Sequence, residues 1–168
     1  MAAPTSNCSA RLLTTMFRHG PTAIRPSCSQ YHEFVKDSQE IANWDRTQGY
    51  QRMQSLIQAN PNMNGVISGK NEMALNAIAA LKEAGKLDGV IVGGFDGSPD
   101  AVEAVKAGEL AYTVLQPVAI FAEEAVRQAD SFIKNGETGV DAEKQPLYCL
   151  LITPDSVDNC SAPFIPDE

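Results

Sequence analysis

The chain has 168 residues, of which 43% are hydrophobic and 20% are charged, and a chain of this size buries about two-thirds of its unfolded surface in one domain. Its formal charge of −8 opposes the phosphate contacts on which nucleic-acid binding depends, and no basic stripe compensates, so nucleic acid is not an expected partner. No apolar run approaches the roughly 18 residues that cross a bilayer, so a membrane-spanning protein is not expected.

The first forty residues have no sustained periodicity, because prolines and scattered serines and threonines interrupt them. We expect residues 1–40 to be irregular, with one helical turn over residues 31–36. Arg11 and Arg18 surround only a short apolar stretch, whereas a signal peptide needs a continuous apolar segment of about 7 to 15 residues. No export signal is therefore expected in this segment.

After Ile41, apolar residues recur at helical spacing and alternate with short β-branched runs. Asp45 is expected to cap a helix that runs to about Asn60, where Pro61 ends it. The next predicted elements are a strand over residues 65–68, a helix over residues 71–84 ended by Gly85, and a strand over residues 89–94.

The second half of the chain continues the alternation. Ser98 followed by Pro99 signals a short helix that runs to about residue 107. Pro117 opens a long amphipathic helix over residues 118–134. The apolar stripe of this helix repeats in threes and fours and consists of Val118, Phe121, Ala122, Ala125, Val126, Ala129, Phe132 and Ile133. The remaining predicted elements are strands over residues 111–115 and 147–152.

The alternation of helices with short apolar strands predicts an α/β fold. Strands without polar alternation are typical of buried parallel sheets. We therefore predict a Rossmann-like parallel sheet flanked by helices, formed by residues 41–158. The irregular segment 1–40 precedes it, and a C-terminal tail over residues 159–168 follows it.

Polar side chains follow three of the predicted strands. Ligands of open parallel sheets bind beyond the carboxyl ends of strands, and Asn71, Asp96 and Gln116 stand there. A carboxylate and two amides bind adjacent hydroxyls by paired hydrogen bonds, and an aromatic ring stacks on the C–H face of a sugar. Trp44, the only tryptophan, is the candidate for that aromatic face. The sequence therefore indicates a site for a polyhydroxylated ligand.

Each of these residues also has a structural interpretation. Asn71 is a suitable helix cap, Asp96 begins an ordinary Asp-Gly turn, and Trp44 fits a half-buried core position. Gln116 is the exception, because glutamine is a poor helix cap and has no local reason to precede a proline.

The four cysteines do not indicate a metal site, because they form no C-x-x-C pair and no histidine stands at metal-ligand spacing. Cys149 and Cys160 fit either a disulfide or two free thiols. We expect no metal and no cofactor.

Three segments stand out in their order and spacing: Ala42-Asn43-Trp44-Asp45-Arg46, Asn71-Glu72-Met73-Ala74-Leu75 and Gly94-Phe95-Asp96-Gly97-Ser98-Pro99-Asp100. They resemble the ribose-type family of periplasmic sugar-binding proteins, and the likeness covers about residues 38–158. The resemblance implies that Trp44 stacks on a sugar or polyol, while Asn71, Asp96 and Gln116 hydrogen-bond its hydroxyls.

The resemblance also implies the substrate-binding component of an ABC-type sugar importer, with permease subunits as partners, a periplasmic location and no enzymatic activity. Members of this family have two similar lobes, and the likeness covers the C-terminal lobe only. In the family, the backbone crosses near Gln116 into the N-terminal lobe, where the next helix packs. Without that lobe, we expect the helix over residues 118–134 to fold onto residues 1–40 or to form a homodimer with a second copy.

Three other functions remain as alternatives. An enzyme on a Rossmann-like fold would need a motif such as G-x-G-x-x-G, a P-loop or G-x-S-x-G, and the sequence has none of them. The effector-binding lobe of a sugar-responsive transcription repressor would carry a basic helix-turn-helix, which residues 1–40 lack. The third alternative is a truncated copy that no longer binds a ligand.

Overall fold

The computed structural model describes residues 10–15, 34–143 and 145–159 of the chain. Its main sheet contains β1 (Ala10–Thr15), β2 (Phe34–Glu40), β3 (Gly65–Ser68) and β4 (Ile91–Gly93). All three pairs are parallel, and the strand order is β2-β1-β3-β4. β2 lies on one side of β1, and β3 and β4 follow on the other side. The direction in which successive strands are added to the sheet therefore reverses at β1.

A second, two-stranded sheet continues from the β4 edge. β5 (Thr113–Leu115) lies beside β4, as two parallel bridges show, Gly93 with Tyr112 and Asp96 with Leu115. β5 also pairs with β6 (Leu150–Ile152).

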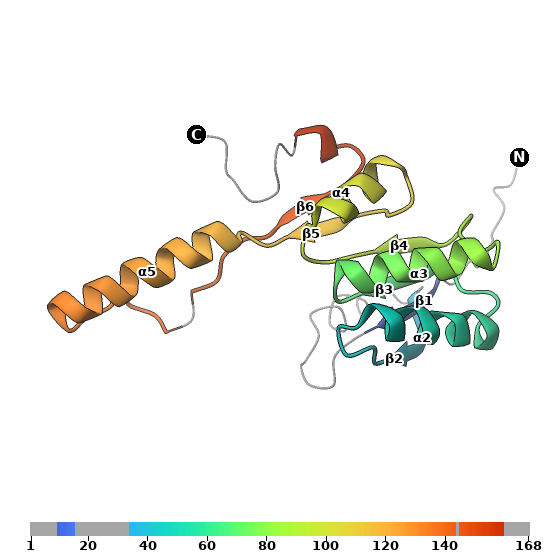
Figure 1. Ribbon diagram of the computed structural model, residues 1–168, viewed down its shortest axis with the longest axis horizontal. Coiled ribbons are helices and arrows are strands. Elements are labelled where there is room, and N and C mark those ends of the chain that lie inside the picture. The colour runs from blue at the N-terminus through green and yellow to red at the C-terminus, as the bar shows by residue number, and fades with distance from the viewer. Residues whose placement is uncertain (1–9, 16–33, 144, 160–168) are drawn as a thin grey trace, which may run out of the picture.

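Three helices connect the strands: α2 (Arg46–Ala59), α3 (Asn71–Glu83) and α4 (Pro99–Lys106). α3 packs against α2 and α4, and Figure 1 shows α2 and α3 side by side. Burying a large apolar side chain contributes about 1.5–3 kcal/mol, so the core between helices and sheet supplies much of the stability. Its largest fully buried apolar side chains are Met53, Val66, Leu81, Val92, Val105, Leu110 and Ile152.

The predicted α/β fold with a parallel sheet and flanking helices is confirmed. The predicted strand over residues 65–68 coincides with β3, and the predicted helices agree closely with α2, α3 and α4. Asp45 caps α2 as expected, because its carboxylate accepts a hydrogen bond from the backbone N–H of Gln48 at 2.8 Å. The predicted strands over residues 89–94 and 111–115 are shorter in the structure, as β4 and β5.

The interpretation of residues 1–40 as irregular is wrong at β1 and β2, which are two strands of the main sheet. β2 also takes the place of the expected helical turn at residues 34–36, while residues 31–33 lie outside the described part of the chain. β2 lies at the sheet edge, where polar residues are tolerated. Its sequence from Val35 to Glu40 therefore lacks the apolar run by which β3, β4, β5 and β6 were predicted.

The last strand differs from the prediction in direction. We expected a further parallel strand over residues 147–152, whereas β6 is shorter and antiparallel to β5. A parallel strand needs a connection that packs back across the sheet to the starting edge. α5 (Val118–Asn135) instead leads away from the sheet, and the chain returns at the edge where β5 ended (Figure 1). β6 therefore runs in the opposite direction.

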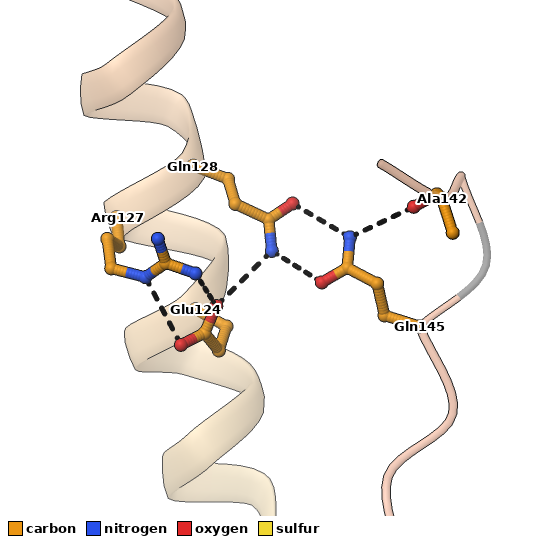
Figure 2. Close-up of polar contacts among 5 residues, drawn as sticks. All are labelled: Glu124, Arg127, Gln128, Ala142 and Gln145. Atoms are coloured by element: carbon orange, nitrogen blue, oxygen red, sulfur yellow. Dashed lines mark hydrogen bonds and ion pairs between the residues drawn. The ribbon is translucent and has the colours of Figure 1, made fainter. Parts of the chain in front are cut away.

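α5 projects from the rest of the molecule, and none of its residues is buried (Figure 1). The segment that returns from α5 contacts the polar side of the helix. Gln128 and Gln145 exchange two side-chain hydrogen bonds, of 2.7 and 3.1 Å, beside the Glu124–Arg127 ion pair (Figure 2). The apolar stripe predicted for this helix is present but exposed. α5 lies well away from β1 and β2, so these described parts of residues 1–40 do not cover it.

Two further observations concern the C-terminal half. Cys149 is an exposed free thiol, and Cys160 lies outside the described residues, so the disulfide alternative is not tested. Within the described ranges, no helix combines the length and the apolar character needed to cross a bilayer.

Candidate functional site

All four predicted ligand-binding residues stand just beyond the carboxyl ends of strands. Trp44 follows β2, Asn71 follows β3, Asp96 follows β4 and Gln116 follows β5. The sheet order reverses at β1, between the strands that lead to Trp44 and Asn71. Ligands of open α/β sheets bind at such a reversal. The structure therefore brings the four positions to the edge of the sheet where this fold holds its ligands.

Asp96 and Gln116 are in direct contact. The side-chain amide of Gln116 donates a hydrogen bond of 3.0 Å to the Asp96 carboxylate. Burial raises the pKa of Asp96, and the negative charge of Glu72 adds to this effect. The hydrogen bond from Gln116 and the positive charge of Lys70 act in the opposite direction and lower this pKa. The carboxylate is thus partly desolvated and held in place by an amide.

The backbone is strained at two of the predicted residues. Asp96 has φ of +112° and Trp44 has φ of +60°, and non-glycine residues with such angles cost of order 1–3 kcal/mol each. Asn43 is the third described non-glycine residue with positive φ, and it directly precedes Trp44. Strain of this kind clusters at functional sites, because the rest of the fold must maintain it. It favours a ligand-binding role over the turn and core interpretations.

Trp44 is half exposed, with 47% of its surface accessible. The turn that carries it is closed by a hydrogen bond from the backbone N–H of Asp45 to the carbonyl of Ala42, at 2.8 Å. The cap at Asp45 then starts α2 immediately after the tryptophan. The indole is therefore presented by a fixed turn and still has accessible surface for a ligand.

Asn71 is buried, with 1% of its surface exposed. Its side-chain oxygen accepts a hydrogen bond from the Thr113 hydroxyl at 2.8 Å, and its side-chain nitrogen donates one to the Ser98 hydroxyl at 3.1 Å. It makes no side-chain cap for α3, so the capping interpretation does not apply. Asn71 instead connects the loop after β3 to β5 and to the start of α4.

We expect Asn71→Ala to lower the free energy of unfolding by roughly 2–4 kcal/mol, because one buried and one partly buried hydrogen bond are lost and the Thr113 hydroxyl loses its acceptor. Urea denaturation measures this change. Asn76→Ala, on the same helix, is the matched control, since Asn76 bonds only to a helix carbonyl. Equal stability of the two variants would contradict the structural role of Asn71.

Two glycines allow this packing. A Cβ at Gly94 would lie 2.4 Å from the side-chain oxygen of Asn71, and a Cβ at Gly97 would lie 2.6 Å from a Leu115 methyl group. Gly97 also has φ of +68°, a conformation that favours glycine. In the Gly-Phe-Asp-Gly segment, Asp96 therefore stands between two glycines, one packed against Asn71 and the other against Leu115.

Sequence reasoning missed Lys70. Its ammonium lies 6.0 Å from the centre of the Trp44 ring and forms an ion pair with Glu72. The positive charge of this ammonium also lowers the pKa of Asp96. Lys70 precedes Asn71 at the end of β3, so the same strand-end argument pointed to it equally well.

The sequence profile of the periplasmic binding protein domain matches residues 27–138 of this chain. A D-apiose import binding protein from Actinobacillus succinogenes is 51% identical over 124 residues, which cover 73% of this chain and 39% of that protein. A ribose import binding protein from Salmonella typhimurium is 43% identical over 103 residues, which cover 61% of this chain and 34% of that protein. The profile match begins well before Ile41, so the likeness extends into the segment predicted to be irregular.

Among solved structures, a Caulobacter myo-inositol binding protein bound to myo-inositol matches with a TM-score of 0.80 and 25% identity. The match covers 94% of this chain and 56% of that one. The chain thus spans less than half the length of the two curated relatives and just over half of this structure.

Proposed function

Because the chain belongs to the periplasmic binding protein family, we propose that it captures a monosaccharide or polyol as the substrate-binding part of an ABC-type importer. Relatives that carry the names of D-apiose and ribose import binding proteins support the class of ligand. The match to a structure that holds myo-inositol supports it as well. The chain leaves its ligand chemically unchanged.

The observation that carries this proposal is the state of Asp96. Its carboxylate is partly desolvated at the carboxyl end of β4, and its backbone has the strained φ of +112°. Neither feature stabilises the fold, and residues that combine them are typical of binding and catalytic sites. A carboxylate accepts hydrogen bonds from two adjacent hydroxyls at once, which is the chemistry of a sugar or polyol.

The neighbours of Asp96 support the same ligand. Gln116 holds the carboxylate and has a second polar atom for a hydroxyl. Trp44 supplies an aromatic face with accessible surface. An aromatic ring beside a carboxylate and an amide suits a ligand that has both C–H and hydroxyl groups.

We further propose permease subunits of the importer as protein partners and the periplasm as the location, since the matching family consists of periplasmic binding proteins. The exposed stripe of α5 is proposed to pair with a second copy of the chain. The return segment contacts the polar side of α5, which leaves the apolar side free to make this contact.

Titration with D-apiose, D-ribose and myo-inositol tests the function. We expect a saturable change in the emission of Trp44, the only tryptophan, with at least one of these ligands. Trp44→Ala should weaken binding about tenfold in calorimetry, because a stacking contact worth about 1.4 kcal/mol is lost. The ligand should be recovered unaltered after long incubation.

Tyr148→Ala is the matched control, because this aromatic ring is 98% exposed and belongs to the segment before β6. Its ligand affinity should equal that of the wild type. Tight binding without any change in Trp44 emission would show that the site lies elsewhere. Release of a modified product would contradict a transport role.

A further inference from the structure

Lys70 occupies a position in the site that surface lysines of this chain do not share. Its ammonium lies 6.0 Å from the centre of the Trp44 ring, and its positive charge lowers the pKa of Asp96. Its side chain is 29% exposed, compared with 48% for Lys82 of α3, which forms an ordinary surface ion pair with Glu109 beyond α4. Lys70 is therefore close to the aromatic ring and near enough to the carboxylate of Asp96 for its charge to be felt there.

The hydrogen-bonding capacity of Lys70 is not used up by its partner. An ammonium has three N–H donors, and the structure gives Lys70 one ion-pair partner, Glu72. Asn71, in contrast, has a buried side chain whose oxygen and nitrogen both bond to neighbouring hydroxyls. The Asn71 amide keeps one further N–H, but its side chain is buried, whereas the Lys70 side chain is 29% exposed and can offer its remaining donors to a ligand.

We propose that Lys70 is a specificity-determining residue of this site, which donates a hydrogen bond to a ligand oxygen while Asp96 accepts from neighbouring hydroxyls. This proposal rests on the proposed function. It assigns a donor to one side of the ligand and an acceptor to the other, so a hydroxyl lost from the ligand on either side weakens binding.

The charges around Lys70 also define the ligand class. Glu72 neutralises the lysine, and Asp96 adds a further negative charge. A carboxylate or phosphate on the ligand would be repelled by the net negative charge that remains. The site therefore takes neutral polyhydroxylated molecules and excludes sugar acids.

The test measures calorimetric affinities of the full chain for D-apiose, D-ribose, myo-inositol and the sugar acid D-ribonate. With the neutral probe that binds tightest, Lys70→Met should bind roughly 10- to 100-fold more weakly than the wild type, because a charge-assisted hydrogen bond is lost. The affinity of Lys70→Gln, which keeps an N–H donor, should lie between those of the wild type and Lys70→Met. Lys82→Met is the matched control and should bind like the wild type.

A second measurement follows the titration of Asp96, first without ligand and then through the pH dependence of binding. The groups that act on the Asp96 carboxyl are Lys70, Glu72, Gln116 and the backbone of Asn71. Loss of the lysine charge should raise the pKa of Asp96 above its wild-type value in carboxyl NMR titration. Binding that needs the ionised carboxylate should then be lost at a higher pH in Lys70→Met than in the wild type.

The outcomes separate the two proposals. Wild-type protein that binds none of the neutral probes overturns the proposed function, and the ligand role of Lys70 with it. Wild-type protein that binds while a folded Lys70→Met binds equally well, or that prefers D-ribonate to D-ribose, overturns the role of Lys70 alone. An unchanged pKa of Asp96 in Lys70→Met contradicts the geometry on which that role depends.

Discussion

Asp96→Asn is expected to weaken ligand binding roughly 100-fold and to leave the protein folded. The asparagine keeps one oxygen acceptor but loses the charge and the second acceptor, and hydrogen bonds to charged groups are worth about 1.5–3 kcal/mol each. The Gln116 amide still finds an oxygen at this position, and asparagine is enriched among residues with positive φ. Calorimetry with the ligand that the wild type binds tightest measures the change.

The same substitution is expected to stabilise the fold at neutral pH. The pKa of Asp96 is raised in the folded state, mainly by burial. A group whose pKa is raised on folding favours the folded state below its unfolded pKa, and this contribution is lost as the pH rises through the folded pKa. At neutral pH the ionised carboxylate therefore lowers the free energy of unfolding, and its replacement by asparagine removes this destabilisation.

Thermal melting of wild type and Asp96→Asn at neutral and mildly acidic pH tests this sign. The melting temperature of the variant should be higher at neutral pH, and the difference should shrink as the pH falls through the pKa of Asp96. Asp100→Asn is the control, because Asp100 is exposed, with 74% of its side chain accessible, and lies at the start of α4. An Asp96→Asn variant that binds like the wild type would contradict the proposed site.

The sequence predicted well the elements whose two ends are both marked by nearby residues, such as a cap, a proline or flanking polar residues. β3 is a short apolar run between polar residues, and α2 begins at a side-chain cap and ends at a proline. β2 has neither signal, because a polar edge strand is stabilised by its pairing with β1. Such pairing joins distant segments, and residue patterns within one segment do not show it.

At the end of β3, strand-end reasoning selected Asn71 and did not consider its neighbour Lys70. Strand-end reasoning identified the loops that carry Trp44, Asp96 and Gln116, because the carboxyl ends of parallel strands meet at one edge. The position of a residue after a strand does not by itself show whether its side chain is buried or accessible. Lys70 is the extended N-cap residue of α3 and Asn71 is the first residue of the helix, so their side chains leave the backbone in different directions. Only the positions of Thr113 and Ser98 show that Asn71 is the buried one.

α5 shows the opposite case, in which the helix was predictable and its surroundings were not. The periodicity of residues 118–134 requires only that one side be covered. The structure leaves that side exposed, with accessibilities of its large apolar residues that range from 40% at Phe121 to 82% at Ile133. Monomeric proteins rarely leave a contiguous apolar patch larger than about 300–600 Å² exposed. A helix of this length, about 27 Å, reaches that range with one side alone.

We expect the wild-type chain to self-associate through this stripe. Covering about 400 Å² of apolar surface contributes about 10 kcal/mol, and association costs on the order of 4–15 kcal/mol, so the balance is close and two charges should shift it. Val126→Glu combined with Ile133→Glu should abolish association, because two carboxylates would have to be desolvated in the contact. Light scattering after size-exclusion chromatography should give a mass above 18.1 kDa for the wild type and about 18.1 kDa for the double variant.

Lys134→Glu controls for charge, because it changes the net charge by the same amount as the double substitution while altering the polar side of α5. Lys134 is exposed and its ion pair with Asp130 is a surface contact, which contributes little to stability. This variant should associate like the wild type, since the stripe is intact. A monomeric wild type whose solubility and melting temperature are unaffected by Val126→Glu and Ile133→Glu would show that the stripe of α5 needs no partner, and pairing with a second copy would then be wrong.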